Sequence, residues 1–486
     1  MGDSCRTGAE HIASLRDGRA VYLDGARVED VTEHPAYRNA VRAVAALYDL
    51  QARPENLEAL TFRPPGAPRR VNRCWQLPLS YDELVLKRQA ILAWAAPTCG
   101  FLGRSPDHVA ATLVGSLAGI DVFERHGAAR AKALRDYFDH VSRNDLFVSY
   151  IITNPQHDRS KPAGEQADEL VAQIVDEDSA GITIRGAKLV GTSAILSNEV
   201  LVASLEPLRP GEEALAFCCA LPMNAPGLSV LSRKSYEAHA VSVFDNPLSS
   251  RFDENDALIH FDDVKVPWER VFVHRDTDMC RAQFHDTYAH SFQNYQAQVR
   301  LSLKLRFLVG IGHRIAETIG SLKLPPVKEQ LGRLAAQAGM FETMVYGMEA
   351  AGARFGPSGC YMPHRHSIYA ATVMSREMYP TFITALRELA GASVIMLPSS
   401  RADLADPALR RLVERTQRSP AMGPLERVKF LKAAWDAIGS EFASRHVQYE
   451  MFYGGPGHVN GQRSYRTYDW AGALGLVDAL LGGYET

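Results

Sequence analysis

The sequence has no feature typical of a membrane-spanning or nucleic-acid-binding protein. No apolar run reaches about 18 residues, the length at which a transmembrane helix is predicted, and the longest apolar stretch is 215–223. The net charge is −3, so there is no surplus of cations to attract nucleic acid or an anionic lipid surface. We therefore expect neither a membrane nor a nucleic acid as a partner.

The cysteine pattern and the first residues point to a reducing compartment. The seven cysteines are odd in number, scattered, and include the adjacent pair Cys218 and Cys219, unlike a secreted disulfide framework. The opening residues, MGDSCRTGAEH, lack the cationic start and apolar core of a signal peptide. We expect a cytoplasmic protein.

Sequence motifs for common nucleotide, hydrolase and zinc chemistry are missing as well. There is no P-loop, HExxH or GxSxG motif, and Ile315 stands where the string that begins at Gly310 needs a third glycine. The Cys and His spacings within 280–290 and 360–366 match no paired CxxC or facial triad. We expect no Rossmann-type dinucleotide site and no metal.

Hydrophobic periodicity divides the chain into three parts. Residues 1–147 are mainly helical in pattern, as in 82–96, whereas 148–276 contain short β-rich runs bounded by turn residues. From 277 to 486 the patterns are again helical and long, as in 290–322. We predict an α+β, mostly α fold with a helical N-terminal domain, a central antiparallel β-barrel and a C-terminal helical bundle.

A polar cluster, GRSPDH, occupies residues 103–108. Ser105 followed by Pro106 is typical of a helix N-cap with proline in the first turn. That arrangement would hold Arg104 just outside the helix and His108 one turn inside it, where both can engage an anionic or phenolic group. The alternative is a capping turn with a solvated arginine.

Two further polar clusters interrupt the β-rich part. In 150–161, YIITNPQHDRSK, the side chains around Asn154 and Gln156 can hydrogen-bond a planar heteroaromatic cofactor, or the segment is only a polar turn. In 185–199, Thr192 and Ser193 place hydroxyls within an apolar run, where a strand would bury them and require partners. Pairing of hydroxyls across strands is the alternative there.

In order and spacing, these clusters resemble the 4-hydroxyphenylacetate 3-monooxygenase large-component family. The stretches 249–272, 290–310 and 388–398 carry the same resemblance, which extends over about 10–455. It implies an acyl-CoA dehydrogenase-like fold and a homotetramer or homodimer. It also implies a two-component monooxygenase: a separate flavin reductase supplies reduced FAD, which with O₂ gives a C4a-hydroperoxide that hydroxylates an aromatic substrate. The alternatives are an acyl-CoA dehydrogenase-like flavoenzyme and a non-catalytic flavin- or ligand-binding protein.

The resemblance also implies catalytic residues, but with an exchange. The family's Arg is retained as Arg104, whereas His108 stands at the family's Tyr position and Tyr150 at its His position. If both side chains face one pocket, His108 is the general base toward a substrate hydroxyl, Tyr150 its hydrogen-bonding partner and Arg104 the stabiliser of the oxyanion. The exchange equally fits a different substrate, such as an indole, a pyrrole, an aminophenol or a carrier-tethered amino acid.

For the flavin, the resemblance implies contacts of three kinds: with the ring, with the pyrophosphate, and with closely approaching backbone. Asn154, Gln156, Thr192 and Ser193 would contact the ring, and Arg300 would bind the pyrophosphate. The backbone at Gly454 and Gly455 would approach the cofactor closely. Thr192 and Ser193 would lie near N5 and the carbonyl edge. Arg300 suits a pyrophosphate because its guanidinium is a fork of donors, and an inter-helix salt bridge is its alternative role.

Overall fold

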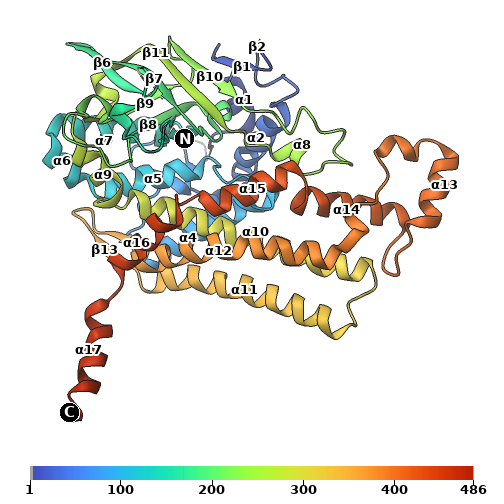
Figure 1. Ribbon diagram of the computed structural model, residues 1–486. Coiled ribbons are helices and arrows are strands. Elements are labelled where there is room, and N and C mark those ends of the chain that lie inside the picture. The colour runs from blue at the N-terminus through green and yellow to red at the C-terminus, as the bar shows by residue number, and fades with distance from the viewer. Residues whose placement is uncertain (1–3, 157, 168, 485–486) are drawn as a thin grey trace.

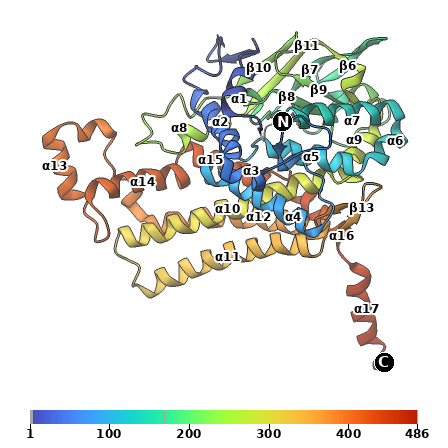
Figure 2. The same cartoon turned by 180° about the vertical axis from the view of Figure 1, so that it is seen from behind.

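The computed structural model describes residues 4–156, 158–167 and 169–484 (Figures 1 and 2). In the N-terminal part, helices predominate and short strands lie between them. The helices are α1 (Gly8–Ser14), α2 (Arg38–Ala52), α3 (Pro54–Leu60), α4 (Tyr81–Ala95), α5 (Asp107–Ala118), α6 (Ile120–His126) and α7 (Ala128–Arg143). The strands are β1 (Ala20–Leu23), β2 (Ala26–Val28), β3 (Thr61–Phe62) and β4 (Val71–Asn72).

The middle of the chain is rich in strands, as predicted. They are β5 (Val148–Ile151), β6 (Gln173–Asp178), β7 (Gly181–Lys188), β8 (Glu199–Ala203), β9 (Phe217–Pro222), β10 (Leu228–Ser232), β11 (Ala257–Pro267) and β12 (Val271–His274), with the short helix α8 (Ser249–Phe252) before β11. Together with β1 and β2 of the N-terminal part, these strands form two sheets, ordered β2-β1-β10-β11-β7-β6 and β12-β9-β8-β5. Most pairs are antiparallel, but β1 with β10 and β5 with β8 are parallel. Such pairs need long crossovers, which local β patterns do not predict.

The C-terminal part is a bundle of long helices. They are α9 (Thr277–His285), α10 (Ala289–Thr318), α11 (Pro325–Ala350), α12 (Arg365–Ala390), α13 (Pro407–Thr416), α14 (Pro424–Ile438), α15 (Glu441–Phe452), α16 (Gly457–Thr467) and α17 (Trp470–Leu481), with the hairpin β13 (Ala353–Phe355) and β14 (Cys360–Met362). Helices α10, α11 and α12 run side by side (Figures 1 and 2). The mostly α, α+β fold class is therefore confirmed.

Helix α10 links the bundle to the N-terminal part. Its first half, 289–301, is buried without interruption, because α4, α5, α11 and α12 all pack against it. At Gly115 of α5 the two helices come so close that an added Cβ would overlap the main chain of Tyr288 and lie 2.6 Å from Ala289 Cα. The junction of α5, α10 and β5 is consequently closely packed.

No helix among the described residues combines the length and the apolar character that crossing a bilayer requires.

Candidate active site

The turn before α5 positions Arg104 and His108. The predicted capping by Ser105 is wrong: its hydroxyl donates to Asp107 Oδ1 (2.5 Å), which also accepts from Gln296 Nε2 (3.1 Å). The buried Asp107 carboxylate competes for the hydroxyl that a cap would use. The main-chain N–H of Arg104 donates to Glu254 Oε2 (2.8 Å), so the Glu254 side chain also holds the turn.

Arg104, His108 and Tyr150 form one cluster. The rings of His108 and Tyr150, both buried, are stacked with centroids 5.5 Å apart and planes inclined by 19°. The Arg104 guanidinium carbon lies 4.4 Å from the centroid of the Tyr150 ring, within cation–π range. The structure thus brings together the three residues that the sequence put forward as catalytic, while their chemical roles stay a prediction.

Two residues that the sequence reasoning missed complete this cluster. The hydroxyl of Tyr453, which follows α15, lies 3.0 Å from His108 Nε2 and donates to the main-chain oxygen of Gln293 (3.1 Å). The side-chain Nε2 of Gln293 donates to the Tyr150 hydroxyl (2.7 Å). Tyr453 directly precedes the two glycines proposed for the cofactor, and Gln293 belongs to the stretch 290–310, so proximity in sequence was the available signal.

The electrostatics of the cluster favour a neutral His108. Burial, followed by the cations Arg104 and Arg300, holds the pKa of His108 well below its ordinary value. His108 Nδ1 and Arg104 Nε are buried and have no hydrogen-bond partner among the described residues. Buried polar atoms are rarely left unpaired in native proteins, so both atoms are available to a ligand or a water molecule.

Thr192 and Ser193 do not lie in a strand, contrary to prediction. β7 ends at Lys188, and Val190 and Ser193 have positive φ angles (62° each), which breaks the extended conformation. The Thr192 hydroxyl donates to Asp256 Oδ1 (2.6 Å), so pairing between strand hydroxyls is not its role either.

An ion-pair network connects this loop to the cluster. Arg445 of α15 binds both Asp256, the partner of Thr192, and Glu254, which accepts from the Arg104 N–H. The N–H of Ser193 donates to the main-chain oxygen of Glu254 (3.0 Å). Both proposed flavin residues of this loop are therefore tied to the turn that carries Arg104.

Asn154 and Gln156 lie in different surroundings. Asn154 is buried, accepts from Lys188 Nζ at Oδ1 (2.6 Å) and donates to Glu206 (3.1 Å), whereas Gln156 is exposed. Burial lowers the pKa of Lys188 to about 8, against the opposing effect of Glu206. Since an ammonium group only donates, Lys188 fixes which way the Asn154 amide faces.

Arg300 forms the inter-helix salt bridge that was the alternative to pyrophosphate binding. Its Nη1 and Nη2 both bind the Glu450 carboxylate, at 2.5 and 2.9 Å, and Lys304 Nζ binds the same group at 3.0 Å. Burial alone would raise the pKa of Glu450, but the two cations lower it to about 2. A contact between Arg300 and a cofactor stays a prediction.

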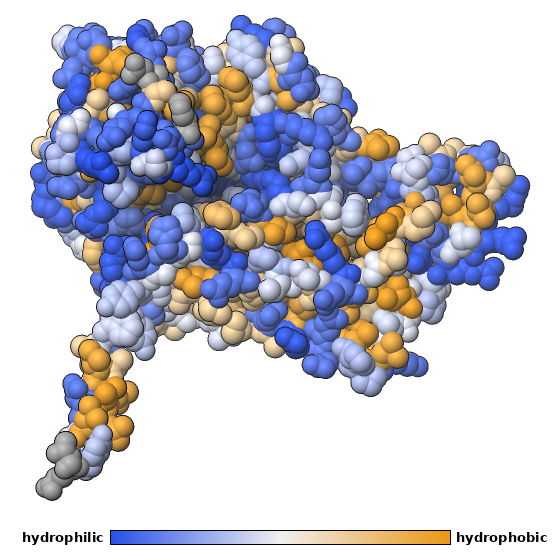
Figure 3. All heavy atoms as spheres, viewed as in Figure 1, coloured by the Kyte–Doolittle hydropathy of each residue, from blue (hydrophilic) through white to orange (hydrophobic). Residues whose placement is uncertain are grey.

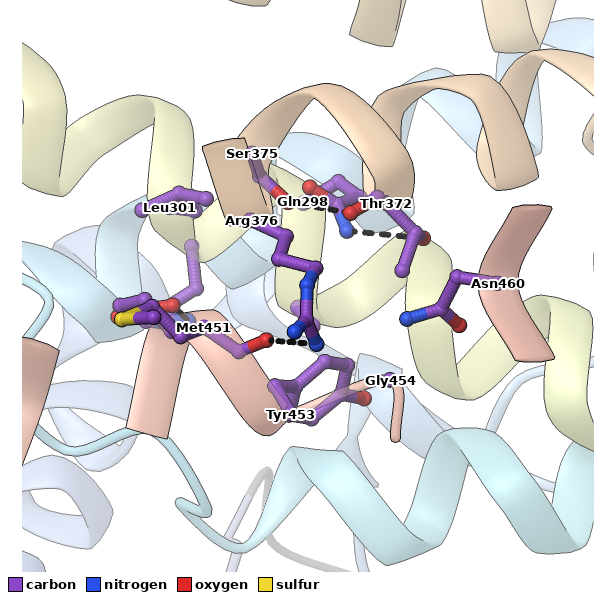
Figure 4. Close-up of a pocket in the computed structure, with 12 residues that line it drawn as sticks. Gln298, Leu301, Thr372, Ser375, Arg376, Met451, Tyr453, Gly454 and Asn460 are labelled. Atoms are coloured by element: carbon purple, nitrogen blue, oxygen red, sulfur yellow. Dashed lines mark hydrogen bonds and ion pairs between the residues drawn. The ribbon is translucent and has the colours of Figure 1, made fainter. Parts of the chain in front are cut away.

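Arg300 and Glu450 also line a small cavity, and Figure 4 labels most of the other lining residues. Its volume is about 10 Å³, room for about one water molecule, and Arg300, Arg376, Tyr453, Gly454 and Asn460 are among its lining residues. A Cβ on Gly454 would lie 2.6 Å from Thr372 Cγ2, so a larger residue there would have to displace the Thr372 side chain. Gly455 follows with φ +92° and open space where a Cβ would be. Backbone at this point can approach a planar ligand closely.

Comparison with known proteins agrees with this architecture. Two family models, described as 4-hydroxyphenylacetate 3-hydroxylase N terminal and C terminal, match residues 7–273 and 280–482. The chain is 34% identical to the 4-hydroxyphenylacetate 3-monooxygenase oxygenase component of Pseudomonas aeruginosa, over 99% of this chain and 93% of the relative. It is 38% identical to the 4-nitrophenol 2-monooxygenase oxygenase component of a Rhodococcus species, over 92% and 86%.

A solved structure shows the same fold over the whole chain. It is the oxygenase component of 4-hydroxyphenylacetate 3-monooxygenase complexed with FAD and 4-hydroxyphenylacetate, with a TM-score of 0.93, 31% identity and 99% of each chain covered. The acyl-CoA dehydrogenase-like fold expected from the resemblance is confirmed. With two family models that together cover nearly its full length, this chain belongs to the 4-hydroxyphenylacetate 3-hydroxylase family.

Proposed function

We propose that this chain is the oxygenase component of a two-component monooxygenase that hydroxylates a phenol with reduced FAD and O₂. The expected class, an FAD-dependent aromatic monooxygenase, agrees with the family to which the chain belongs. The observation that carries the proposal for the substrate is the cluster of Arg104, His108 and Tyr150. In it, a neutral imidazole and a guanidinium each present an unpaired nitrogen in a buried environment.

The residues present fit a bound flavin. Gly455 leaves open space where a Cβ would be, and its main-chain oxygen accepts from Arg376 and Asn460, whose side chains suit the polar groups of a cofactor. Thr192, Ser193 and Asn154 would hold the ring, and Gly454 and Gly455 would admit it. When bound, reduced FAD supplies the activated oxygen, and a separate flavin reductase supplies the reduced FAD.

The protein's own groups would prepare the substrate. His108 Nδ1 accepts the proton of the phenol as a neutral imidazole; because burial and the neighbouring arginines also lower its pKa and make it a weak base, the transfer depends on stabilisation of the phenolate. The Arg104 guanidinium stabilises the phenolate, and the Tyr150 hydroxyl donates a hydrogen bond to its oxygen. Deprotonation enriches the aromatic ring with electrons, and the buried setting keeps water away from the reacting groups.

A substrate panel tests this function. The chain, reduced FAD from a supplied reductase, and O₂ would be incubated with para-substituted phenols, indole and aminophenols, and product and H₂O₂ would be measured. Hydroxylated product is expected from phenols and not from indole, which has no hydroxyl for His108 and Arg104. H₂O₂ without product from every compound would favour the alternatives, a dehydrogenase-like or a non-catalytic flavoprotein.

We also propose that copies of this chain assemble through α17 as a homodimer or homotetramer. Helix α17 projects away from the body of the molecule, and its surface is mostly apolar (Figures 1 and 3). None of its residues is buried, and Leu474, Leu476 and Leu480 are 56%, 76% and 68% exposed. An apolar surface of this kind is typical of a protein–protein interface.

For the location we propose the cytoplasm. All seven cysteines are free thiols, and all but Cys99 are buried. Burial raises the pKa of the Cys219 and Cys280 thiols to about 12, so both are protonated and unreactive at neutral pH. Free thiols are what a reducing compartment maintains.

A further inference from the structure

The hydrogen bonds around Gln293 have a fixed direction. The main-chain oxygen of Gln293 can only accept, so the proton between it and the Tyr453 hydroxyl, 3.1 Å away, belongs to Tyr453. A tyrosine hydroxyl has one proton, and Tyr453 has thus no proton to give to His108 Nε2 at 3.0 Å. The contact between Tyr453 and His108 therefore needs a proton on Nε2.

A proton on Nε2 leaves the other ring nitrogen as a lone pair. Neutral imidazole carries a single N–H, so His108 Nδ1 is an acceptor. The reverse tautomer would let Tyr453 donate to Nε2, and it would then set the oxygens of Tyr453 and Gln293, 3.1 Å apart, against each other without a proton. This defect disfavours it.

Gln293 acts as a hydrogen-bond donor toward Tyr150, whereas its main-chain oxygen accepts from Tyr453. Its side-chain Nε2 donates to the Tyr150 oxygen at 2.7 Å, which leaves the proton of Tyr150 free to turn toward a ligand. One residue of α10 thus reaches both rings of the stack, one through Tyr453 and the other directly. The site presents one acceptor and one donor to a phenol.

We propose that Gln293 and Tyr453 are positioning residues that set these directions, making His108 Nδ1 the acceptor of the substrate proton and the Tyr150 hydroxyl a donor to the phenolate. This inference rests on the proposed function. The phenol O–H bond breaks, its proton binds Nδ1, and the electron pair stays on the phenolate oxygen. The imidazolium that forms keeps its Nε2–H on Tyr453.

The surroundings of His108 make the tautomer, rather than the charge, decisive. The groups that act on it are Arg104 from the turn before α5, Tyr150 from β5, Arg300 from α10 and Tyr453 from the end of α15, and Tyr449 contacts both Arg104 and Tyr453. These are cations and neutral hydroxyls, so the resting imidazole is neutral over the ordinary pH range. Without the acceptor at Tyr453, both neutral tautomers become accessible.

Tyr453→Phe tests the proposal with two phenols. One is un-ionised at the assay pH and needs the base, and the other, such as 4-nitrophenol at alkaline pH, is already ionised. We expect kcat for the un-ionised phenol to fall at least about tenfold, a modest share of what general-base catalysis contributes. The ionised phenol should keep at least half of the wild-type kcat. Equal losses with both phenols would overturn the proposal.

Gln293→Met tests the second direction. Removal of the donor lets the Tyr150 hydroxyl turn away, so KM for both phenols should rise on the order of tenfold, the loss of about one charge-assisted hydrogen bond. The control is Tyr295→Phe on the same helix, whose hydroxyl donates to Glu349 outside the cluster. It should change neither constant, and an unchanged KM in Gln293→Met would contradict the role of Gln293.

Nitrogen-15 NMR of the histidines separates this inference from the proposed function. The His108 signals, assigned by their loss in His108→Gln, should show a protonated Nε2 and a bare Nδ1 in the wild type, and a mixture in Tyr453→Phe. A protonated Nδ1 in the wild type would overturn the inference even if phenols are hydroxylated. If no phenol is hydroxylated but Nε2 carries the proton, the function fails and the hydrogen-bond assignment stands.

Discussion

His108 and Tyr150 are stacked in the core where α5 meets β5, with ring centroids 5.5 Å apart and planes inclined by 19°. The family resemblance places a Tyr and a His at these two positions in the opposite order. Because the rings lie face to face within one cluster, an exchange of residue types leaves the same chemical groups in the same cluster. The exchange is therefore compatible with retained catalysis.

The double variant His108→Tyr/Tyr150→His tests this equivalence. Each single substitution leaves two like side chains and removes either the base or the phenolic donor, so we expect a loss of about a hundredfold in product formation. The double variant restores both groups and should recover to within about tenfold of the wild type. Product per reduced flavin is the measurement, and a double variant no better than the worse single would disprove the equivalence.

Arg104→Ala and His108→Ala should uncouple the reaction. Both side chains contact Tyr150 rather than the glycines and the loop proposed for the flavin, so FAD affinity should be kept. Oxygen consumption then continues while product falls and H₂O₂ rises. A peroxidase assay and FAD titration measure both quantities, with the exposed Arg306→Ala of α10 as control. Full product yield in either variant would show that its side chain does not act on the substrate.

The sequence predicted the large elements well and the loops poorly. The helical pattern of 290–322 corresponds to α10. This helix is buried on several sides, so its apolar residues recur at regular helical spacing. Residues 425–452 have a continuous helical pattern in the sequence, but they form two helices, α14 and α15, which divide at Gly439, since periodicity alone does not register a break. Strand propensity likewise misplaced Thr192, whose loop is held by Asp256 from a distant segment.

In the candidate site as well, the sequence indicates single residues but not the contacts between distant segments. Arg104, His108 and Tyr150 could be named from local motifs, but their stack depends on how β5 packs against α5. Tyr453 and Gln293 could not be named, because neither residue type in its own segment indicates a role until the fold brings them to His108. Arg300 could be named because it lies in the stretch 290–310. Its partner Glu450 could not, because it lies in a distant part of the chain.

Glu450→Gln should destabilise the protein through two buried cations. Arg300 and Lys304 are each at most 1% exposed and share this one carboxylate, so its removal leaves their charges uncompensated. Breaking a buried pair costs about 3–5 kcal/mol. Chemical denaturation, with the exposed Glu329→Gln as control, measures the free energy of unfolding. A loss no greater than that of the control would show that the ion pair does not stabilise the fold.

The free energy of unfolding should also depend on the protonation of Glu450 at acid pH. The pKa of Glu450 is depressed to about 2 in the folded state, below its ordinary value of 4.5. The folded state therefore binds this proton less readily, and the stabilisation is complete above pH 4.5 and declines as the pH falls toward 2. In Glu450→Gln this part of the acid dependence should be missing. An identical acid dependence in variant and wild type would contradict the assignment.

Gly115→Ala should loosen the junction that positions the site. The new methyl would overlap the main chain of Tyr288, which cannot yield as a flexible side chain can, so we expect a cost of about 1–3 kcal/mol or more. Gly310→Ala on α10 is the matched control, since its Cβ meets nothing within 4 Å and alanine favours helix by about 0.5–1 kcal/mol. Thermal unfolding should thus shift in opposite directions, and equal shifts would show that the α5–α10 crossing tolerates a side chain.

Leu476→Glu and Leu480→Glu test the role of α17 in assembly. Both leucines are largely exposed on a helix that no described residue of the same chain buries, so charges there should not harm the fold of one subunit. In an interface between copies they would bury carboxylates without partners, which strongly disfavours association. Light scattering after size exclusion should show a multiple of 53.6 kDa for the wild type and a smaller mass for the double variant. Asp478→Asn on the same helix should keep the wild-type mass. A single-subunit mass for the wild type, or no change in the double variant, would mean that α17 does not hold copies of this chain together.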